Sequence, residues 1–153
     1  MRALFLFGPN LGALGTRDPE RYGSETLDEV MTAVAEDAAG RGHDVAWRQS
    51  DREGDLIGWL HAAAKEGFDA VAINPGALTH YSHALRDAIE GCGLPVVEVH
   101  QTNIYSREEF RRHSVVSPVC RAVIAGLGTR GYHLALEALA WISPDGERAS
   151  PRG

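Results

Sequence analysis

The segment Phe68–Asp87, FDAVAINPGALTHYSHALRD, constrains the fold more than any other part of the chain. Its residues 70–73 are continuously apolar, which is typical of a strand buried on both faces in a parallel sheet. Pro75 has no N–H to contribute to a sheet ladder, so the strand ends at Asn74. Ligands of open parallel sheets bind at the carboxyl ends of strands, so this polar exit is a candidate site. The alternative is that Asn74 and Thr79 only cap and turn the chain.

Strand and helix patterns alternate along the whole chain. Thr26 and Glu29 have the spacing of a capping box, and apolar residues then recur at helical intervals as far as Gly40. Similar patterns predict further helices, and short apolar or alternating runs predict strands. The predicted strands cover residues 3–7, 44–49, 70–74, 96–99 and 121–125, and the predicted helices cover 27–40, 55–66, 82–90 and 132–141.

This alternation predicts an α/β fold with a five-stranded parallel sheet and helices on both faces. For a chain of 153 residues we expect the flavodoxin-like strand order 2-1-3-4-5. Residues 1–142 are expected to form a single domain, and residues 143–153 a loose C-terminal tail. The strand order would bring Asn10, Asn74 and His100, each at the end of a strand, to one edge of the sheet.

Charge and cysteine content exclude several functional classes. The formal net charge is −6, with acidic and basic residues interspersed, which argues against nucleic acid or an anionic membrane as partner. Cys92 and Cys120 lie far apart in the sequence, so neither a zinc site nor a redox pair is indicated. The apolar run at the N-terminus is too short for a signal peptide or a membrane span, and we expect a cytoplasmic protein.

Two pairs of residues have the composition of catalytic groups. Arg17 and Tyr22 share a Gly-rich loop, and a guanidinium beside a phenol lowers the phenol pKa, which would make Tyr22 a candidate base. The alternative is a surface loop with an exposed arginine and a packed tyrosine. Glu98 and His100 alternate along one strand and therefore face the same side, so the carboxylate can orient an imidazole that acts as a general acid.

Two further motifs have competing interpretations. The basic segment Arg107–His113 suits an anion, although clustered charges often only face water. Gly126–Gly131 matches the dinucleotide-binding fingerprint. That fingerprint requires a second strand after its helix, with an acidic residue at its tip, and the chain has none. We interpret this motif as a tight turn from a strand into a helix.

Four segments resemble the type II 3-dehydroquinate dehydratases, and together they span nearly the whole chain. They are GPNLGALGTRDPERYG at residues 8–23, INPGALTHYSHALRDA at 73–88, EVHQTNIYSREEFRRHS at 98–114 and GLGTRGYHLALEAL at 126–139. The resemblance implies a flavodoxin-like enzyme that converts 3-dehydroquinate to 3-dehydroshikimate by anti elimination of water through an enolate. It also implies a homo-oligomer, a dodecamer built of trimers, that uses no metal and no cofactor.

The resemblance also assigns catalytic roles. Tyr22 is similar to the base that removes a C2 proton, and Arg17 to the residue that keeps this tyrosine ionised. Asn10 resembles the residue that stabilises the enolate through a bound water. His100 resembles the acid that protonates the departing C1 hydroxyl, and Glu98 the group that holds its ring.

Substrate-binding residues follow from the same resemblance. Asn74, His80 and Arg111 resemble the residues that bind ring hydroxyls. Thr102 and the backbone at Gln101 occupy the positions of the carboxylate anchor. Asp87 resembles an acid donated by a neighbouring subunit.

The sequence departs from the family pattern at two positions near these residues. Phe7 stands where the family commonly has Asn, and Gln101 where a small aliphatic residue is usual. Two alternatives therefore stay open. One is a non-enzymatic flavodoxin-like module that binds FMN or a nucleotide, and the other is an enzyme of this fold acting on a related cyclic polyol acid. The chemistry is the same in aromatic biosynthesis and in quinate breakdown, so both pathways also stay open.

Overall fold

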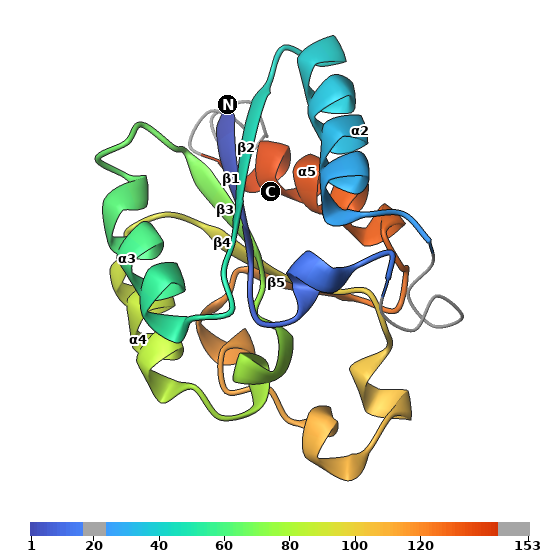
Figure 1. Ribbon diagram of the computed structural model, residues 1–153. Helices are drawn as coiled ribbons and strands as arrows, with labels where there is room; N and C mark the ends of the chain where they lie inside the picture. The colour runs from blue at the N-terminus through green and yellow to red at the C-terminus, as the bar shows by residue number, and fades with distance from the viewer. Residues whose placement is uncertain (17–23, 144–153) are drawn as a thin grey trace, which may run out of the picture.

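The computed structural model describes residues 1–16 and 24–143, which are built around one sheet of five parallel strands (Figure 1). The strand order is β2-β1-β3-β4-β5, so the predicted flavodoxin-like order is confirmed. The strands are β1 (Arg2–Phe7), β2 (Asp44–Gln49), β3 (Ala70–Asn74), β4 (Val96–His100) and β5 (Ala122–Ala125).

Helices cover both faces of the sheet (Figure 1). One face is covered by α2 (Leu27–Gly40) and α5 (Arg130–Ile142), and the other by α3 (Glu53–Ala63) and α4 (His83–Gly91). No helix within residues 1–16 and 24–143 is long and apolar enough to span a membrane.

Each face of the sheet has its own hydrophobic core because side chains alternate along the strands. In β1, Ala3, Phe5 and Phe7 pack with α2 and α5. Leu4 and Leu6 pack with α3 and α4. All five are almost completely buried, and each of the larger ones contributes about 1.5–3 kcal/mol to the free energy of unfolding. β1 therefore anchors the sheet from both sides and holds its carboxyl end in a fixed position.

Helix boundaries follow the sequence signals with one notable difference. The capping box of α2 is confirmed, because the Thr26 side chain accepts from the Glu29 N–H and the Glu29 carboxylate accepts from the Thr26 N–H. The predicted range 55–66 was wrong for α3, which begins at Glu53 and ends at Ala63. The Phe68 N–H bonds the Ala63 carbonyl, and Gly67 has a φ of 81°, so the predicted last turn is a Schellman turn rather than a helix.

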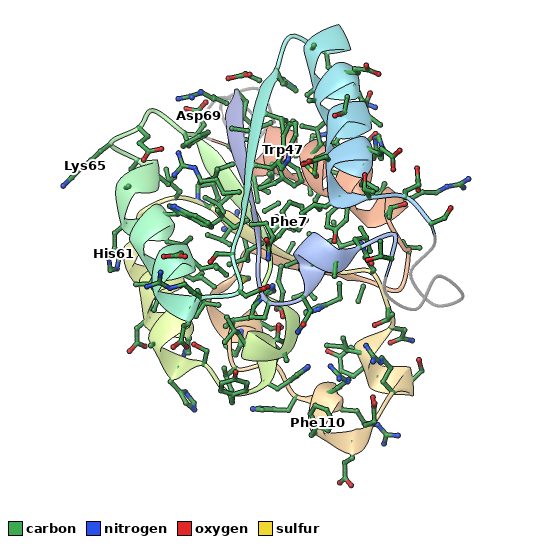
Figure 2. All side chains as sticks on the ribbon, viewed as in Figure 1. Phe7, Trp47, His61, Lys65, Asp69 and Phe110 are labelled. Atoms are coloured by element: carbon green, nitrogen blue, oxygen red, sulfur yellow. The ribbon has the colours of Figure 1, made fainter. Side chains whose placement is uncertain are left out.

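Short 3-10 turns follow the carboxyl ends of three strands. They are η1 (Leu11–Ala13) after β1, η2 (Gly76–His80) after β3, and η3 (Ile104–Ser106) and η4 (Glu109–Arg112) after β4. A further turn, η5 (Ser117–Val119), directly precedes β5. The segment with η3 and η4 projects beyond the sheet, and Figure 2 shows Phe110 at its tip. The edge of the sheet with the polar strand exits is thus partly enclosed by irregular chain.

Candidate active site

The exits of β1 and β3 pack directly against each other, and glycine makes this contact possible. The Gly8 N–H donates to the Asn74 carbonyl over 2.8 Å. A Cβ atom on Gly8 would lie 2.5 Å from the Pro75 carbonyl oxygen, which is closer than any side chain tolerates. Gly76 has a φ of 59° and approaches the Pro9 carbonyl in the same way. The two Pro-containing exits therefore form one tight corner with Asn10 and Asn74 beside it.

A cavity of about 160 Å³ lies at this corner, between the strand exits and the projecting segment. Leu11, Leu14 and Ile104 contribute apolar wall. Most of the site residues predicted from the sequence also line it. They are Asn10, Asn74, His80, His100, Gln101, Thr102 and Arg111. The structure thus brings together residues from four separate parts of the chain.

His100 and Glu98 form a buried pair at the end of β4. The His100 Nε2 lies 2.7 Å from the Glu98 Oε1, so the expectation that both side chains face the same side is confirmed. Ser114 and Ser117 also donate hydroxyl hydrogen bonds to this carboxylate, which is fully buried. Burial raises the Glu98 pKa, but the bonds from His100, Ser117 and Ser114 outweigh it, so the pKa lies below its usual value. An ionised Glu98 accepts the Nε2–H and leaves Nδ1 as the ring nitrogen open to a ligand.

Asn74 has its amide held at both ends. Its Oδ1 accepts from the Gly76 N–H over 3.2 Å, and its Nδ2 donates to the Tyr132 hydroxyl over 2.9 Å. One N–H of the amide remains for a ligand in the cavity.

His80 is held as a neutral imidazole. Its Nδ1 lies 2.8 Å from the His113 carbonyl oxygen, which can only accept, so Nδ1 carries the proton. Burial lowers the His80 pKa, and the Arg111 guanidinium lowers it further. The ring also meets Phe110 edge-on at 5.7 Å between centroids. The other ring nitrogen, Nε2, is therefore an acceptor suited to a ligand hydroxyl.

The basic segment divides between the cavity and the surface. Arg107 and Arg111 line the cavity, whereas Arg112 and His113 are exposed and do not. Arg107 Nη1 donates to Thr102 Oγ1 over 3.3 Å, and Arg111 Nε donates to a Glu108 carboxylate oxygen over 2.9 Å. Two guanidinium groups at the wall favour an anionic ligand.

Four predicted site residues are not part of the described wall. Glu98 does not line the cavity and acts on it only through His100. Asp87 is exposed on α4 and does not line the cavity of its own chain. Arg17 and Tyr22 lie outside the described residues, so their roles stay predictions.

The Gly126–Gly131 motif connects β5 to α5, as a tight turn with positive φ at Gly126 and Gly128. Within the described residues no strand follows α5. The same part of the chain, residues 1–16 and 24–143, contains no group of His, Cys, Asp and Glu arranged to hold a metal ion.

Sequence reasoning missed Ser114, Ser117 and Tyr132 as parts of the site. Ser114 and Ser117 bond Glu98 from a loop whose path is set by tertiary contacts. The sequence places Tyr132 in a helix, and a hydroxyl group on a buried helix face is itself a signal that a hydrogen-bond partner must exist there.

Comparison with known proteins gives a consistent result. Residues 1–140 match the family model described as dehydroquinase class II. The chain is 53% identical over 143 residues to the 3-dehydroquinate dehydratase of Pelotomaculum thermopropionicum, covering 94% of this chain and 99% of that protein. It is 54% identical over 137 residues to the 3-dehydroquinate dehydratase of Thermus thermophilus, covering 90% of this chain and 92% of that protein.

Solved structures agree with the family match and the sequence relatives. The crystal structure of the type II dehydroquinase from Propionibacterium acnes superposes with a TM-score of 0.87 at 47% sequence identity. The match covers 91% of this chain and 95% of that one.

Proposed function

Because the chain belongs to the class II dehydroquinase family, we propose that it converts 3-dehydroquinate to 3-dehydroshikimate by anti elimination of water through an enolate. Membership makes the chain an enzyme, a dehydratase of 3-dehydroquinate. The observation that best supports the mechanism is the Glu98–His100 pair, because it supplies an acid at the wall of a cavity that binds polar groups.

The reaction needs a base in its first step and an acid in its second. Tyr22, ionised beside Arg17, takes a proton from C2, and the C–H electrons form an enolate with the C3 carbonyl. Asn10 stabilises this enolate through a water molecule. The enolate then collapses, the C1–O bond breaks, and the departing hydroxide takes a proton from His100 Nδ1 to leave as water. A C1–C2 double bond remains.

The environment of His100 suits the acid role. A ring that donates from Nδ1 must be protonated on both nitrogens, because Nε2–H is bonded to Glu98. The buried carboxylate stabilises this positive charge before the proton is transferred. After transfer the ring is neutral and stays in place through the same Nε2 bond.

The remaining wall residues orient the substrate. Asn74, His80 and Arg111 present donors and an acceptor to the ring hydroxyls. The carboxylate is anchored by Thr102 with the backbone at Gln101. Leu11, Leu14 and Ile104 supply apolar wall between these polar groups, so the polar groups decide the orientation of the ring.

The direct test is turnover of 3-dehydroquinate by the purified protein, followed by the absorbance of the conjugated enone product. Turnover supports the proposal. The absence of turnover in folded protein, together with binding of FMN or a nucleotide, would favour a non-enzymatic module. Turnover of a different cyclic polyol acid in preference to 3-dehydroquinate would favour the second alternative.

Replacing Glu98 with Gln is expected to lower kcat about 10²-fold, because the amide cannot stabilise a protonated His100. The substitution should also change how the free energy of unfolding depends on pH. The Glu98 pKa lies below its usual 4.5, so the ionised group stabilises the folded state above that pH. This stabilisation is lost as the pH falls through the lowered folded-state pKa. Urea unfolding between about pH 6 and about pH 3 should therefore show a smaller loss of stability with acid in the variant.

A matched control is Glu29→Gln. Glu29 is exposed and caps α2, and its pKa is also lowered, mainly by the backbone hydrogen bond at Thr26. This variant should keep the wild-type kcat. Unchanged kcat in Glu98→Gln as well would argue that the carboxylate has no part in the acid step.

We further propose that the active form is a homo-oligomer, as in a dodecamer built of trimers. Asp87 is exposed on α4 and does not line its own cavity, so it can complete the cavity of a neighbouring copy. Light scattering combined with activity at decreasing protein concentration tests this. Full activity in separated monomers would exclude a contribution from a neighbour's Asp87.

A further inference from the structure

Tyr132 joins two residues of the cavity wall through a single hydroxyl group. It lies in the first turn of α5 and is completely buried. Its oxygen accepts from Asn74 Nδ2 at 2.9 Å and from Gln101 Nε2 at 3.1 Å. Asn74 ends β3, and Gln101 directly follows β4, so one helix side chain connects the exits of two neighbouring strands.

The tyrosine is a fixed acceptor and not a base. Burial raises the Tyr132 pKa to about 12, so the hydroxyl stays neutral. Its ring is held by the Phe7 ring, which meets it edge-on at 5.2 Å between centroids and an interplanar angle of 76°. The oxygen therefore keeps one position while its proton remains free to turn about the C–O bond.

Gln101 controls where that proton points. With Nε2 donating, Gln101 and Asn74 occupy both lone pairs of the Tyr132 oxygen, and the proton must point away from both. Turning the Gln101 amide by 180° would let Oε1 accept the proton, and the oxygen would still offer a lone pair to Asn74. An apolar residue at position 101 would remove one of the two contacts that fix the hydroxyl, so its proton could sample orientations that weaken the bond from Asn74.

The orientation of Asn74 determines what it offers to a ligand. Its other end is bonded to the Gly76 N–H, so the Tyr132 bond decides whether the amide is held at one end or at both. An amide held at both ends presents its remaining N–H in one direction only, and this lowers the entropy that binding must remove.

We propose that Gln101 is a positioning residue for substrate binding, which acts through the Tyr132 hydroxyl to hold the Asn74 amide with one N–H available to the cavity. This inference rests on the proposed function, in which Asn74 binds a ring hydroxyl of 3-dehydroquinate. Its basis is the pair of bonds at Tyr132 together with the burial of Gln101, which is only 7% exposed although it lines the cavity.

The hydrogen-bonded connection from Gln101 through Tyr132 to Asn74 is called the relay below. Steady-state kinetics of Gln101→Met, Tyr132→Phe and the double variant test it. Methionine has a similar length and no hydrogen-bonding amide. Gln101→Met is expected to raise KM for 3-dehydroquinate about 3- to 10-fold, as for the loss of one hydrogen bond, while kcat changes less than about 2-fold. Tyr132→Phe should raise KM by at least as much. In the Tyr132→Phe background, Gln101→Met should have no further effect, because the relay is already broken.

Two outcomes would overturn the proposal. Unchanged KM in Gln101→Met means that the amide does no positioning. Additive effects in the double variant mean that Gln101 acts on the substrate directly and not through Tyr132. Tyr81→Phe, at an exposed tyrosine that does not line the cavity, is the matched control and should behave as wild type. Thermal unfolding of each variant checks that the fold is kept.

A crystal structure of ligand-free Gln101→Met separates this inference from the proposed function. The relay predicts that the Asn74 amide turns or moves beyond hydrogen-bonding distance of the Tyr132 oxygen. An unchanged Asn74 would refute the relay whether or not the protein turns over 3-dehydroquinate. Failure of the wild-type protein to turn over 3-dehydroquinate would instead refute the proposed function alone.

Discussion

Replacing Tyr22 with phenylalanine is expected to lower kcat for 3-dehydroquinate by about 10³-fold, with a much smaller change in KM. The described wall of the cavity offers no other good base. It contains no carboxylate, and its titratable nitrogen bases are His80 and His100. Burial lowers the pKa of His80, which makes it a poor proton acceptor, and the proposed mechanism gives His100 the role of acid. The two wall arginines, Arg107 and Arg111, would favour an anionic phenolate brought close to them.

The measurement is single-turnover and steady-state absorbance of the product, with Tyr105→Phe as the control. Tyr105 is an exposed tyrosine of η3 that does not line the cavity, so its variant should keep the wild-type kcat. Arg17→Ala should also lower kcat. Without the guanidinium the Tyr22 phenol stays neutral, and a neutral phenol cannot accept the proton. If Tyr22→Phe kept nearly full activity and His80→Asn had none, the role of base would be assigned to His80.

The second large effect is expected from His100→Asn, which should lower kcat by about 10³-fold. Asparagine can still donate a hydrogen bond to Glu98, so the buried carboxylate keeps a partner while the cavity loses its proton donor. The free energy of unfolding should therefore change by only about 1 kcal/mol. Chemical denaturation and turnover, measured on the same preparation, separate the two effects.

His100→Leu is the comparison that isolates the structural part of the pair. It removes both the acid and the hydrogen-bond partner of a fully buried carboxylate. Breaking a buried pair from one side costs about 3–5 kcal/mol, so this variant should be less stable than His100→Asn by several kcal/mol. Equal stability of the two variants would mean that Ser114 and Ser117 satisfy Glu98 without the histidine. Wild-type kcat in His100→Asn would exclude His100 as the acid.

Local patterns in the sequence were sufficient for the architecture. The apolar runs, the Thr26 capping box and the strand-ending prolines follow from interactions between residues near in the chain. The strand order then follows because parallel strands joined by helices have few compact arrangements. Asn10, Asn74 and His100 meet at one edge as a consequence, and the His100–Glu98 pair follows from alternation within a single strand.

The contacts around Tyr132 show what such patterns leave out. Phe7 and Gln101 lie far apart in the chain, and the sequence indicates no relation between them. In the folded chain the Phe7 ring packs against Tyr132, and the Gln101 amide donates to its hydroxyl. Asn74 meets the same oxygen. Phe7 and Gln101 are thus connected through one side chain of α5.

The amino-acid sequence by itself determined the order of the elements, the sheet and the identity of most wall residues, since these depend on periodicity and on short-range backbone chemistry. Only the tertiary structure decided which polar atoms pair. It assigned Ser114 and Ser117 to Glu98, divided the basic segment between cavity and surface, and joined Asn74 to Gln101 through Tyr132. Hydrogen bonds require atoms within about 3 Å of each other and a suitable angle. Across long stretches of chain, that geometry is set by how the sheet and helices pack.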